Sequence, residues 1–405
     1  MTDYTEVERS IWRAHPARLI DAALEAIDAW LGADGAEVLL IDYHQSHLVP
    51  FAHATGGRPV PVDGHPAGQA YAACRGVPDE DRLYLPLSVY GERLGVLAVR
   101  LPPDSAAKSE ELADVADNLA RAIVVANTAT DIYREIRRRK RLTVAAEMQW
   151  ELLPGRTCRS DEFSLAGQLE PAYAVSGDNF DWSMSRDSLT LSVTNGMGSG
   201  VRAALLTQLA VSSLRNARRS GAGPAESAEL ASGMLYGQYG GESHSSTLIL
   251  RITLATGEAE VVDAGSPRML RIRRGEIGPV PFDEQMPLGM FSDTRYRAQP
   301  LTLLPGDRLM ILSDGLYTAR GPSGQVYGEA PLTTAMRRSR LQDPDEAVRF
   351  LISDLLLYHE GSDLADDAIA VCLDWNGTAA APEPAGGAGG AQLITPERTS
   401  PDVMT

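Results

Sequence analysis

Four short polar segments, each placed where an apolar run begins or ends, constrain this chain more than any other feature. They are Ser176-Gly177-Asp178 with Asp181, the run from Thr194 to Gly200, Ser313-Asp314-Gly315, and Asp366-Asp367. The apolar runs beside them read as strands, and the ends of neighbouring strands can present side chains into one cleft. Several oxygen ligands without matching His or Cys indicate a hard divalent cation, Mg²⁺ or Mn²⁺, rather than zinc. The first hypothesis is therefore a metal-dependent hydrolase.

The order and residues of these segments resemble the motifs of the metal-dependent protein phosphatases, and more closely those of the bacterial branch typified by the sporulation stage II E phosphatase. That branch reads Gly-Gly-Asp-x-x-Asp, Asp-x-Met-Gly-x-Gly, Ser/Thr-Asp-Gly-x-x-Glu-Ala and Asp-Asp-x-Thr in this order. The matching residues here are 176–181, 195–200, 313–319 and 366–369. The resemblance covers about residues 142–375. It implies a mixed α/β fold in which residues 154–375 form an αββα sandwich, two antiparallel sheets flanked by helix pairs.

The resemblance also implies how the site works. The implied metal ligands, of which the three aspartates are also the catalytic residues, are Asp178, Asn195, Gly196, Asp314 and Asp366. Asp181 and Asp367 would orient ligands or waters around them. Two Mn²⁺ or Mg²⁺ ions, about 3.5 to 4 Å apart, would activate a water and neutralise the phosphoryl oxygens in one step. No covalent phosphoenzyme is needed.

One position departs from the pattern, because Asn195 stands where the branch has a bridging aspartate. An amide carries no charge, and the loss of even an outer contact typically costs ~10- to 100-fold in metal affinity or activity. Three hypotheses stay open. The chain is a serine/threonine protein phosphatase for a regulatory protein such as an anti-sigma factor antagonist, or a pseudophosphatase that binds the same partner, or a dimeric sensor without phosphatase chemistry.

The N-terminal third resembles a GAF sensor domain, here residues 5–125. The expected elements, in order, are an amphipathic helix at 5–31, strands at 37–43 and 47–52, a short helix at 68–73, a hairpin of 82–90 with 93–100, and a long helix. Gly32 is a stop signal for the first helix. Such a domain can hold a small-molecule ligand or serve only as a relay, and no ligand can be named.

A single helix is expected from residue 107 to residue 153, because no Pro or Gly interrupts the run. Its apolar residues alternate spacings of four and three, which is typical of a two-stranded coiled coil and predicts a homodimer through this linker. The alternative is a helix packed on its own sheet. The basic run 137–141 is best interpreted as a solvated helix face. Residues 142–153 resemble the switch helix that precedes the phosphatase domain in this branch, which makes Glu147 and Gln149 candidate regulatory residues.

Composition narrows the remaining classes. A length of 405 residues predicts two or three domains, and a net charge of −17 argues against nucleic-acid binding. Three scattered cysteines form no disulfide framework, the first residues do not resemble a signal peptide, and no run of about 18 apolar residues occurs. We therefore expect a cytoplasmic protein that does not enter a membrane. Residues 376–405 are rich in Gly, Ala and Pro and are expected to be a disordered tail.

Overall fold

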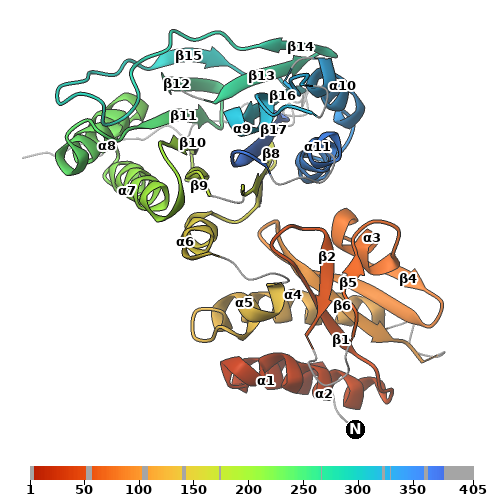
Figure 1. The fold of residues 1–405 in the computed structure, drawn as a ribbon. Helices are drawn as coiled ribbons and strands as arrows, with labels where there is room; N and C mark the ends of the chain where they lie inside the picture. The colour runs from red at the N-terminus through yellow and green to blue at the C-terminus, as the bar shows by residue number, and fades with distance from the viewer. Residues whose placement is uncertain are drawn as a thin grey trace, which may run out of the picture.

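The computed structural model describes residues 4–51, 57–102, 108–138, 143–172, 175–265, 267–321, 324–328, 330–359 and 364–377. Within these ranges the chain forms an N-terminal unit built on one sheet and a C-terminal unit built on two, with helix α6 (Val144–Leu152) between them (Figure 1). The expected mixed α/β class is confirmed. Nearly all of the expected tail lies outside the described residues. Among the helices described, none is long and apolar enough to cross a bilayer.

The N-terminal sheet has the strand order β3-β2-β1-β6-β5-β4, with antiparallel neighbours throughout. Its strands are β1 (Glu37–Ile41), β2 (His47–Pro50), β3 (Val60–Pro61), β4 (Val77–Asp79), β5 (Arg82–Val89) and β6 (Glu92–Arg100). Side chains alternate between the two faces of a strand. Val38 and Leu40 of β1 therefore join the core under the long helices, while Leu39 and Ile41 pack toward the short helix α3 (Pro66–Ala73) on the other face.

The helix expected at 5–31 is two helices, α1 (Tyr4–Arg13) and α2 (Leu19–Leu31), joined by a 3₁₀ turn at Pro16–Arg18. Proline has no backbone N–H to donate and its ring clashes with the preceding helical turn, so Pro16 breaks the helix. The side chain of His15 accepts a hydrogen bond from Ala17 N and caps the turn. Gly32 ends α2 in the left-handed conformation, as expected.

The prediction of a single helix at 107–153 is also wrong, because this segment too is divided into shorter helices. The structure has α4 (Ser109–Ala126), α5 (Ile132–Arg137) and α6. Between α4 and α5 the Thr128 hydroxyl donates to Val125 O (2.7 Å), an interaction that competes with helical backbone bonding. Thr143 accepts a hydrogen bond from Ala146 N and begins α6 as a new helix. Part of the basic run, residues 139–141, lies outside the described ranges.

The apolar seam that predicted a coiled coil packs inside the N-terminal unit. Of the seven predicted seam residues, only Ala129 is exposed, in the break between α4 and α5. The other six are buried in the core of this unit: Val115, Leu119, Ala122, Ala126, Tyr133 and Ile136. The alternative, a helix packed on its own sheet, is therefore what the structure shows. This seam gives no support to a homodimer through the linker.

The C-terminal unit stacks two antiparallel sheets. One has the order β15-β12-β11-β10-β9 and the other β14-β13-β16-β17-β8-β7. The first contains β9 (Asp178–Met184), β10 (Ser188–Gly196), β11 (Ser245–Thr253), β12 (Glu258–Ala264) and β15 (Gln299–Thr302). The second contains β7 (Thr157–Arg159), β8 (Phe163–Glu170), β13 (Arg268–Arg273), β14 (Glu276–Pro279), β16 (Asp307–Leu312) and β17 (Ala368–Trp375).

Three apolar clusters hold these layers together. One fills the space between the two sheets, with fully buried side chains such as Phe163, Leu250 and Val371. A second joins the first sheet to α7 (Gly200–Arg219) and α8 (Pro224–Tyr239), and a third joins the second sheet to α10 (Ala330–Ser339) and α11 (Pro344–Tyr358). Figure 1 shows these helix pairs on the two sides of the unit. The arrangement is the αββα sandwich.

The two units contact each other through the β5–β6 hairpin. Arg93 forms a buried ion pair with Asp345 of α11 and donates a hydrogen bond to Ala72 O (2.6 Å). Beyond the hairpin tip, Thr157 donates to Gly91 O, and Arg156 donates to Tyr43 O (2.6 Å). These bonds position the N-terminal unit against the start of the C-terminal one.

Candidate metal centre

The predicted acidic residues come together at one end of the sandwich. Asp178 is the first residue of β9 and lies directly opposite Asn195 in the β9–β10 ladder. Asp314 begins the short helix α9 (Asp314–Tyr317) after β16, and Asp366 lies two residues before β17. Strand ends from both sheets thus present these side chains to one another, as the sequence predicted.

The carboxylate of Asp178 is the most unusual group in this cluster. The residue is fully buried, and neither side-chain oxygen has a hydrogen-bond partner among the described residues. Ser313 is nearby, but its hydroxyl donates to the carbonyl of Asp367 (3.2 Å). Burial, followed by the negative charges of Asp367, Asp366 and Asp314, raises the pKa of Asp178 well above its usual range. An unbonded buried carboxylate is costly unless a cation meets it.

Asp367 organises the loop that carries Asp178. Its carboxylate accepts hydrogen bonds from the backbone N–H groups of Ala172 (2.8 Å), Ser176 (2.9 Å) and Gly177 (3.0 Å). A longer bond comes from Asp178 N (3.3 Å). The loop before β9 is therefore wrapped around one buried carboxylate.

Asn195 faces Asp314 with its nitrogen. The amide Nδ2 donates a short hydrogen bond to Asp314 Oδ1, which also accepts from Gly315 N (3.1 Å). Burial and the charge of Asp366 raise the pKa of Asp314, and these hydrogen bonds oppose the rise. At the position where the branch places a bridging carboxylate, this chain thus places a hydrogen-bond donor.

Two glycines allow the backbones at the site to approach one another. A Cβ at Gly196 would lie 2.2 Å from the Thr207 hydroxyl of α7, and a Cβ at Gly315 would lie 2.0 Å from Asp367 O. Both distances are far below van der Waals contact, so only glycine fits. Thr207, which the sequence analysis did not identify, donates a short hydrogen bond to Gly177 O. A buried hydroxyl on the apolar face of a helix is the signal that could have revealed it.

Asp181 has a different partner from the one expected. Its two oxygens accept from Arg215 (2.8 Å) and Arg218 (2.9 Å), both on α7, and the residue is buried. Asp181 therefore ties α7 to β9 through two ion pairs. The two arginines lie three positions apart on one helix face, a spacing that could have predicted a shared acidic partner.

Helix α6 reaches the site through Gln149. The buried amide Nε2 donates to Asp367 Oδ2 (2.6 Å) and to Asp178 O (2.7 Å). Glu147 does not reach the cluster, because it forms an ion pair with Arg138 on the opposite side of α6. Of the two candidate regulatory residues, the structure brings only Gln149 to the acidic cluster.

The donor set fits a divalent cation in part. Asp178 supplies two buried oxygens that no described residue satisfies, and Asp314 and Asp366 lie close enough to influence its pKa. Carboxylate oxygens of this kind suit Mg²⁺ or Mn²⁺. In the described part of the chain, however, no three His, Cys, Asp or Glu side chains form a ready-made metal cage. The residues fit one cation better than a bridged pair, because Asn195 contributes a donor.

A cavity of about 410 Å³ opens beside α9. Its lining includes Leu248, Arg268, Phe282 and Tyr317. The Arg268 guanidinium lies over the Tyr317 ring, 4.0 Å from its centre, and burial together with the charge of Asp314 raises the pKa of Tyr317. The cavity is thus next to the acidic cluster, and the sequence analysis had identified neither Arg268 nor Tyr317.

Comparison with known protein families supports the resemblance that the sequence motifs indicated. A family model described as "Stage II sporulation protein E (SpoIIE)" matches residues 185–376, which include Asn195, Asp314 and Asp366 but begin after Asp178. No curated protein matches the chain.

Several solved structures are similar to the C-terminal unit. The RsbU and RsbW domains of a Mycobacterium tuberculosis protein share 21% identity, with a TM-score of 0.47, over 54% of this chain and 61% of that one. The phosphatase domain and regulatory fragment of SpoIIE from Bacillus subtilis share 19%, with a TM-score of 0.47, over 54% and 66%. The SiaA PP2C domain of Pseudomonas aeruginosa shares 19%, with a TM-score of 0.49, over 57% and 94%. The chain thus spans less than two thirds of the first two structures. Residues 185–376, somewhat less than half of the chain, are thus similar to the stage II sporulation protein E family.

Proposed function

We propose that the chain is a metal-dependent protein phosphatase that removes phosphate from phosphoserine or phosphothreonine on a regulatory protein of the anti-sigma factor antagonist type. The observation that supports this best is the buried carboxylate of Asp178, which lacks a hydrogen-bond partner among the described residues. Its neighbours are the acidic residues of the other family motifs, Asp314 and Asp366. A cation is the simplest counterpart for this set of charges.

Asp178, Asp314 and Asp366 would hold the cation, with the Gly196 carbonyl at the edge of the site. A bound divalent ion supplies an activated water and neutralises the phosphoryl oxygens. The chain contributes rigidity: Asp367 fixes the loop before Asp178 through its backbone N–H bonds, and Gln149 fixes Asp367 from α6. Preorganised ligands of this kind lose little energy by rearranging when substrate binds.

The cavity beside α9 is the proposed path of the phosphorylated side chain. Arg268 is exposed and lines the cavity together with Tyr317, so its guanidinium can meet a negatively charged group there. A guanidinium is well suited to a phosphoryl group because its planar donors can bind two oxygens at once. The acidic chain gives no reason to expect a nucleic-acid substrate.

The N-terminal unit would act as the GAF-like sensor of a cytoplasmic signalling protein. Its β5–β6 hairpin contacts the phosphatase unit, and α6 connects the two units through Gln149. A change in the N-terminal unit could thus alter the position of α6. We propose Gln149 as the residue that relays it to the acidic cluster.

A second function is favoured by one observation. The Asn195 amide donates to Asp314, so a second ion would lack a bridging carboxylate. In that case the chain is a partner-binding module derived from a phosphatase, which binds the phosphorylated protein but turns it over poorly. The number of Mn²⁺ ions bound separates the two functions, since two-metal hydrolysis needs two occupied sites.

The test is aryl phosphate hydrolysis across a Mn²⁺ titration, with native protein, Asn195→Asp and Asp314→Asn compared at equal folded concentration. If the native protein turns over and Asp314→Asn does not, the phosphatase proposal stands and Asn195 is a tolerated ligand. If only Asn195→Asp is active, the native chain is a binding module. If none is active, the metal-dependent phosphatase proposal fails.

A further inference from the structure

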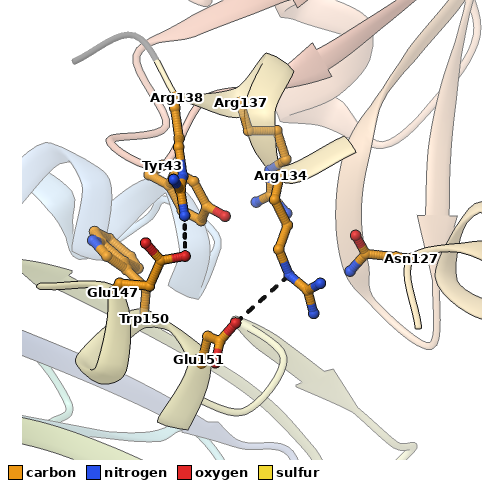
Figure 2. Close-up of a pocket in the computed structure, with 8 residues that line it drawn as sticks. All are labelled: Tyr43, Asn127, Arg134, Arg137, Arg138, Glu147, Trp150 and Glu151. Atoms are coloured by element: carbon orange, nitrogen blue, oxygen red, sulfur yellow. Dashed lines mark hydrogen bonds and ion pairs between the residues drawn. The ribbon is translucent and has the colours of Figure 1, made fainter. Parts of the chain in front are cut away.

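A second polar cavity lies on the side of α6 opposite to Gln149 and the acidic residues. Its volume is about 330 Å³, and it is bounded by the β1–β2 loop, the end of α4, α5 and α6 (Figure 2). Its lining residues are Tyr43, Asn127, Arg134, Arg137, Arg138, Glu147, Trp150 and Glu151. It lies where the N-terminal unit meets α6, and none of the proposed phosphatase residues except Glu147 contributes to it. The phosphatase chemistry therefore does not explain it.

Hydrogen-bond donors dominate this lining. A guanidinium carries five N–H donors. In the part of the chain that is described, each arginine uses one: Arg134 donates to Asp131 (3.2 Å), Arg137 to Ile41 O (2.9 Å), and Arg138 to Glu147. Three arginines thus share a small cavity with two glutamates, in a chain whose net charge is −17.

Buried polar atoms without hydrogen-bond partners also indicate a ligand at this cavity. Arg138 Nε and Trp150 Nε1 are buried donors that have no hydrogen-bond partner among the described residues, and Trp150 is only 9% exposed. Asn127 Oδ1 is a buried acceptor that also has no hydrogen-bond partner among the described residues. Native proteins rarely leave such groups unsatisfied without a bound water, ion or ligand. The two unsatisfied donors require acceptor atoms.

An added anion can compete with the glutamate in one of the ion pairs across the cavity. Figure 2 shows Arg134 of α5 and Arg138, the residue directly after α5, reaching toward Glu151 and Glu147 of α6. The Arg134–Glu151 pair is long, at 3.9 Å, and the Glu151 side chain is 59% exposed. Exposed pairs of this kind contribute little to stability, so an anion of higher charge can replace the glutamate.

We propose that this cavity is a binding site for a small oxyanion, a molecule that carries a phosphate or a carboxylate group held by Arg134 and Arg138. Guanidinium groups bind both oxyanions through two parallel N–H bonds, which fits the free donors here. The volume is at the lower end of the range for small-molecule sites, so the ligand is a compact metabolite rather than a peptide. Binding at this site does not depend on whether the phosphatase proposal is correct.

The experiment uses the full chain, freed of metal with EDTA so that phosphate does not bind at the acidic cluster through a cation. Inorganic phosphate and citrate are titrated separately, with sodium chloride at matched ionic strength as the control for screening. Binding is followed by calorimetry and by tryptophan fluorescence, since Trp150 lines the cavity. The variants are Arg134→Gln/Arg138→Gln and, as a matched control, Arg121→Gln, an exposed arginine of α4 that also faces an aspartate.

We expect saturable binding of at least one oxyanion to the native protein and to Arg121→Gln. The double variant should bind about tenfold more weakly or worse, because hydrogen bonds to charged groups are the strong ones. Binding of phosphate alone identifies phosphate esters as the ligand class, and binding of citrate alone identifies carboxylates. The proposal is overturned if neither oxyanion binds beyond the chloride control, or if the double variant binds as tightly as the native protein.

A second variant, followed by fluorescence, keeps the proposal testable if the double arginine variant folds poorly. Trp150→Phe keeps the ring packing but removes the indole signal at the cavity. The oxyanion-dependent fluorescence change should disappear in Trp150→Phe while calorimetric binding persists. A change that survives in Trp150→Phe would place the ligand elsewhere and contradict the proposal.

Discussion

The side-chain amide of Gln149 donates a 2.6 Å hydrogen bond to the carboxylate of Asp367, although the residues lie 218 positions apart in the chain. The same amide nitrogen also donates to the carbonyl of Asp178 (2.7 Å). The helix between the two units is thus bonded directly to the loop that carries the unsatisfied carboxylate. Any movement of α6 must break or stretch these bonds.

Gln149→Ala should therefore weaken metal binding without unfolding the protein. Loss of a group that orients metal ligands typically reduces metal affinity by ~10- to 100-fold. The Mn²⁺ concentration for half-maximal binding, measured by calorimetry, should rise by that factor. Val144→Ala, at a 67% exposed position of the same helix, is the matched control and should bind as the native protein does. Equal affinity for Gln149→Ala would show that α6 does not support the site.

Asp367→Asn should destabilise the protein more than Asp366→Asn, although the two residues are adjacent. Asp367 is buried and accepts several backbone hydrogen bonds, whereas Asp366 is half-buried and accepts one, from Asp367 N (2.9 Å). Losing bonds to a buried charge should lower the free energy of unfolding by about 3 kcal/mol. Urea denaturation measures the difference, and equal loss in both variants would contradict the role assigned to Asp367.

The Arg93–Asp345 pair should behave as a buried ion pair between the units. The side chains are 6% and 9% exposed, and among the described residues Arg93→Met leaves Asp345 with a single 3.5 Å ion pair, to Arg159. Breaking one side of a buried pair typically costs about 3 to 5 kcal/mol, while replacing both partners with apolar residues is often neutral. Arg93→Met/Asp345→Leu should thus recover most of the stability lost in Arg93→Met. A double variant no more stable than the single one would contradict this.

Manganese binding should release protons and weaken as the pH falls. Burial raises the pKa of Asp178 and of Asp314, and a protonated carboxyl must lose its proton to bind a metal. In the metal-free protein, the effect of these carboxyls on stability changes with pH in the opposite direction to that of a salt-bridged acid. The contribution of these two carboxyls to the free energy of unfolding is largest below their unfolded pKa of about 3.9 and falls as the pH rises through the raised folded values.

Calorimetry in buffers of different ionisation enthalpy measures the protons released on Mn²⁺ binding. The pH dependence of urea unfolding, with and without Mn²⁺, measures the linkage to stability. Absence of proton release near neutral pH would show that these carboxyls are already ionised before the metal binds.

Much of the C-terminal unit could be predicted because its signals are local. The alternation of Leu189, Leu191 and Val193 sets one face of β10, and Pro224 starts α8 after a Gly-rich break. The acidic motifs lie at strand ends, so their convergence followed from the sheets. Strand β9 is harder to predict, because the Asp178-Asn179-Phe180-Asp181 sequence has few of the residues that favour strands.

What the sequence did not predict depends on partners distant in the chain. Asp181 reads as a motif acid, but Arg215 and Arg218 determine its role. The seam from Val115 to Ile136 has the spacing of a coiled coil, yet the same spacing serves a helix buried on its own sheet. The cavity between α5 and α6 exists only because the predicted single helix is broken at two places.

The most direct test of the central proposal is the Mn²⁺ dependence of phosphoserine-peptide hydrolysis by the native protein and by Asp178→Asn. Asp187→Asn, an exposed residue in the turn between β9 and β10, is the matched control. We expect Mn²⁺-dependent release of phosphate by the native protein and by Asp187→Asn, and a loss of at least about tenfold in Asp178→Asn. Turnover by Asp178→Asn equal to that of the native protein would contradict the assignment of the buried carboxylate to the metal.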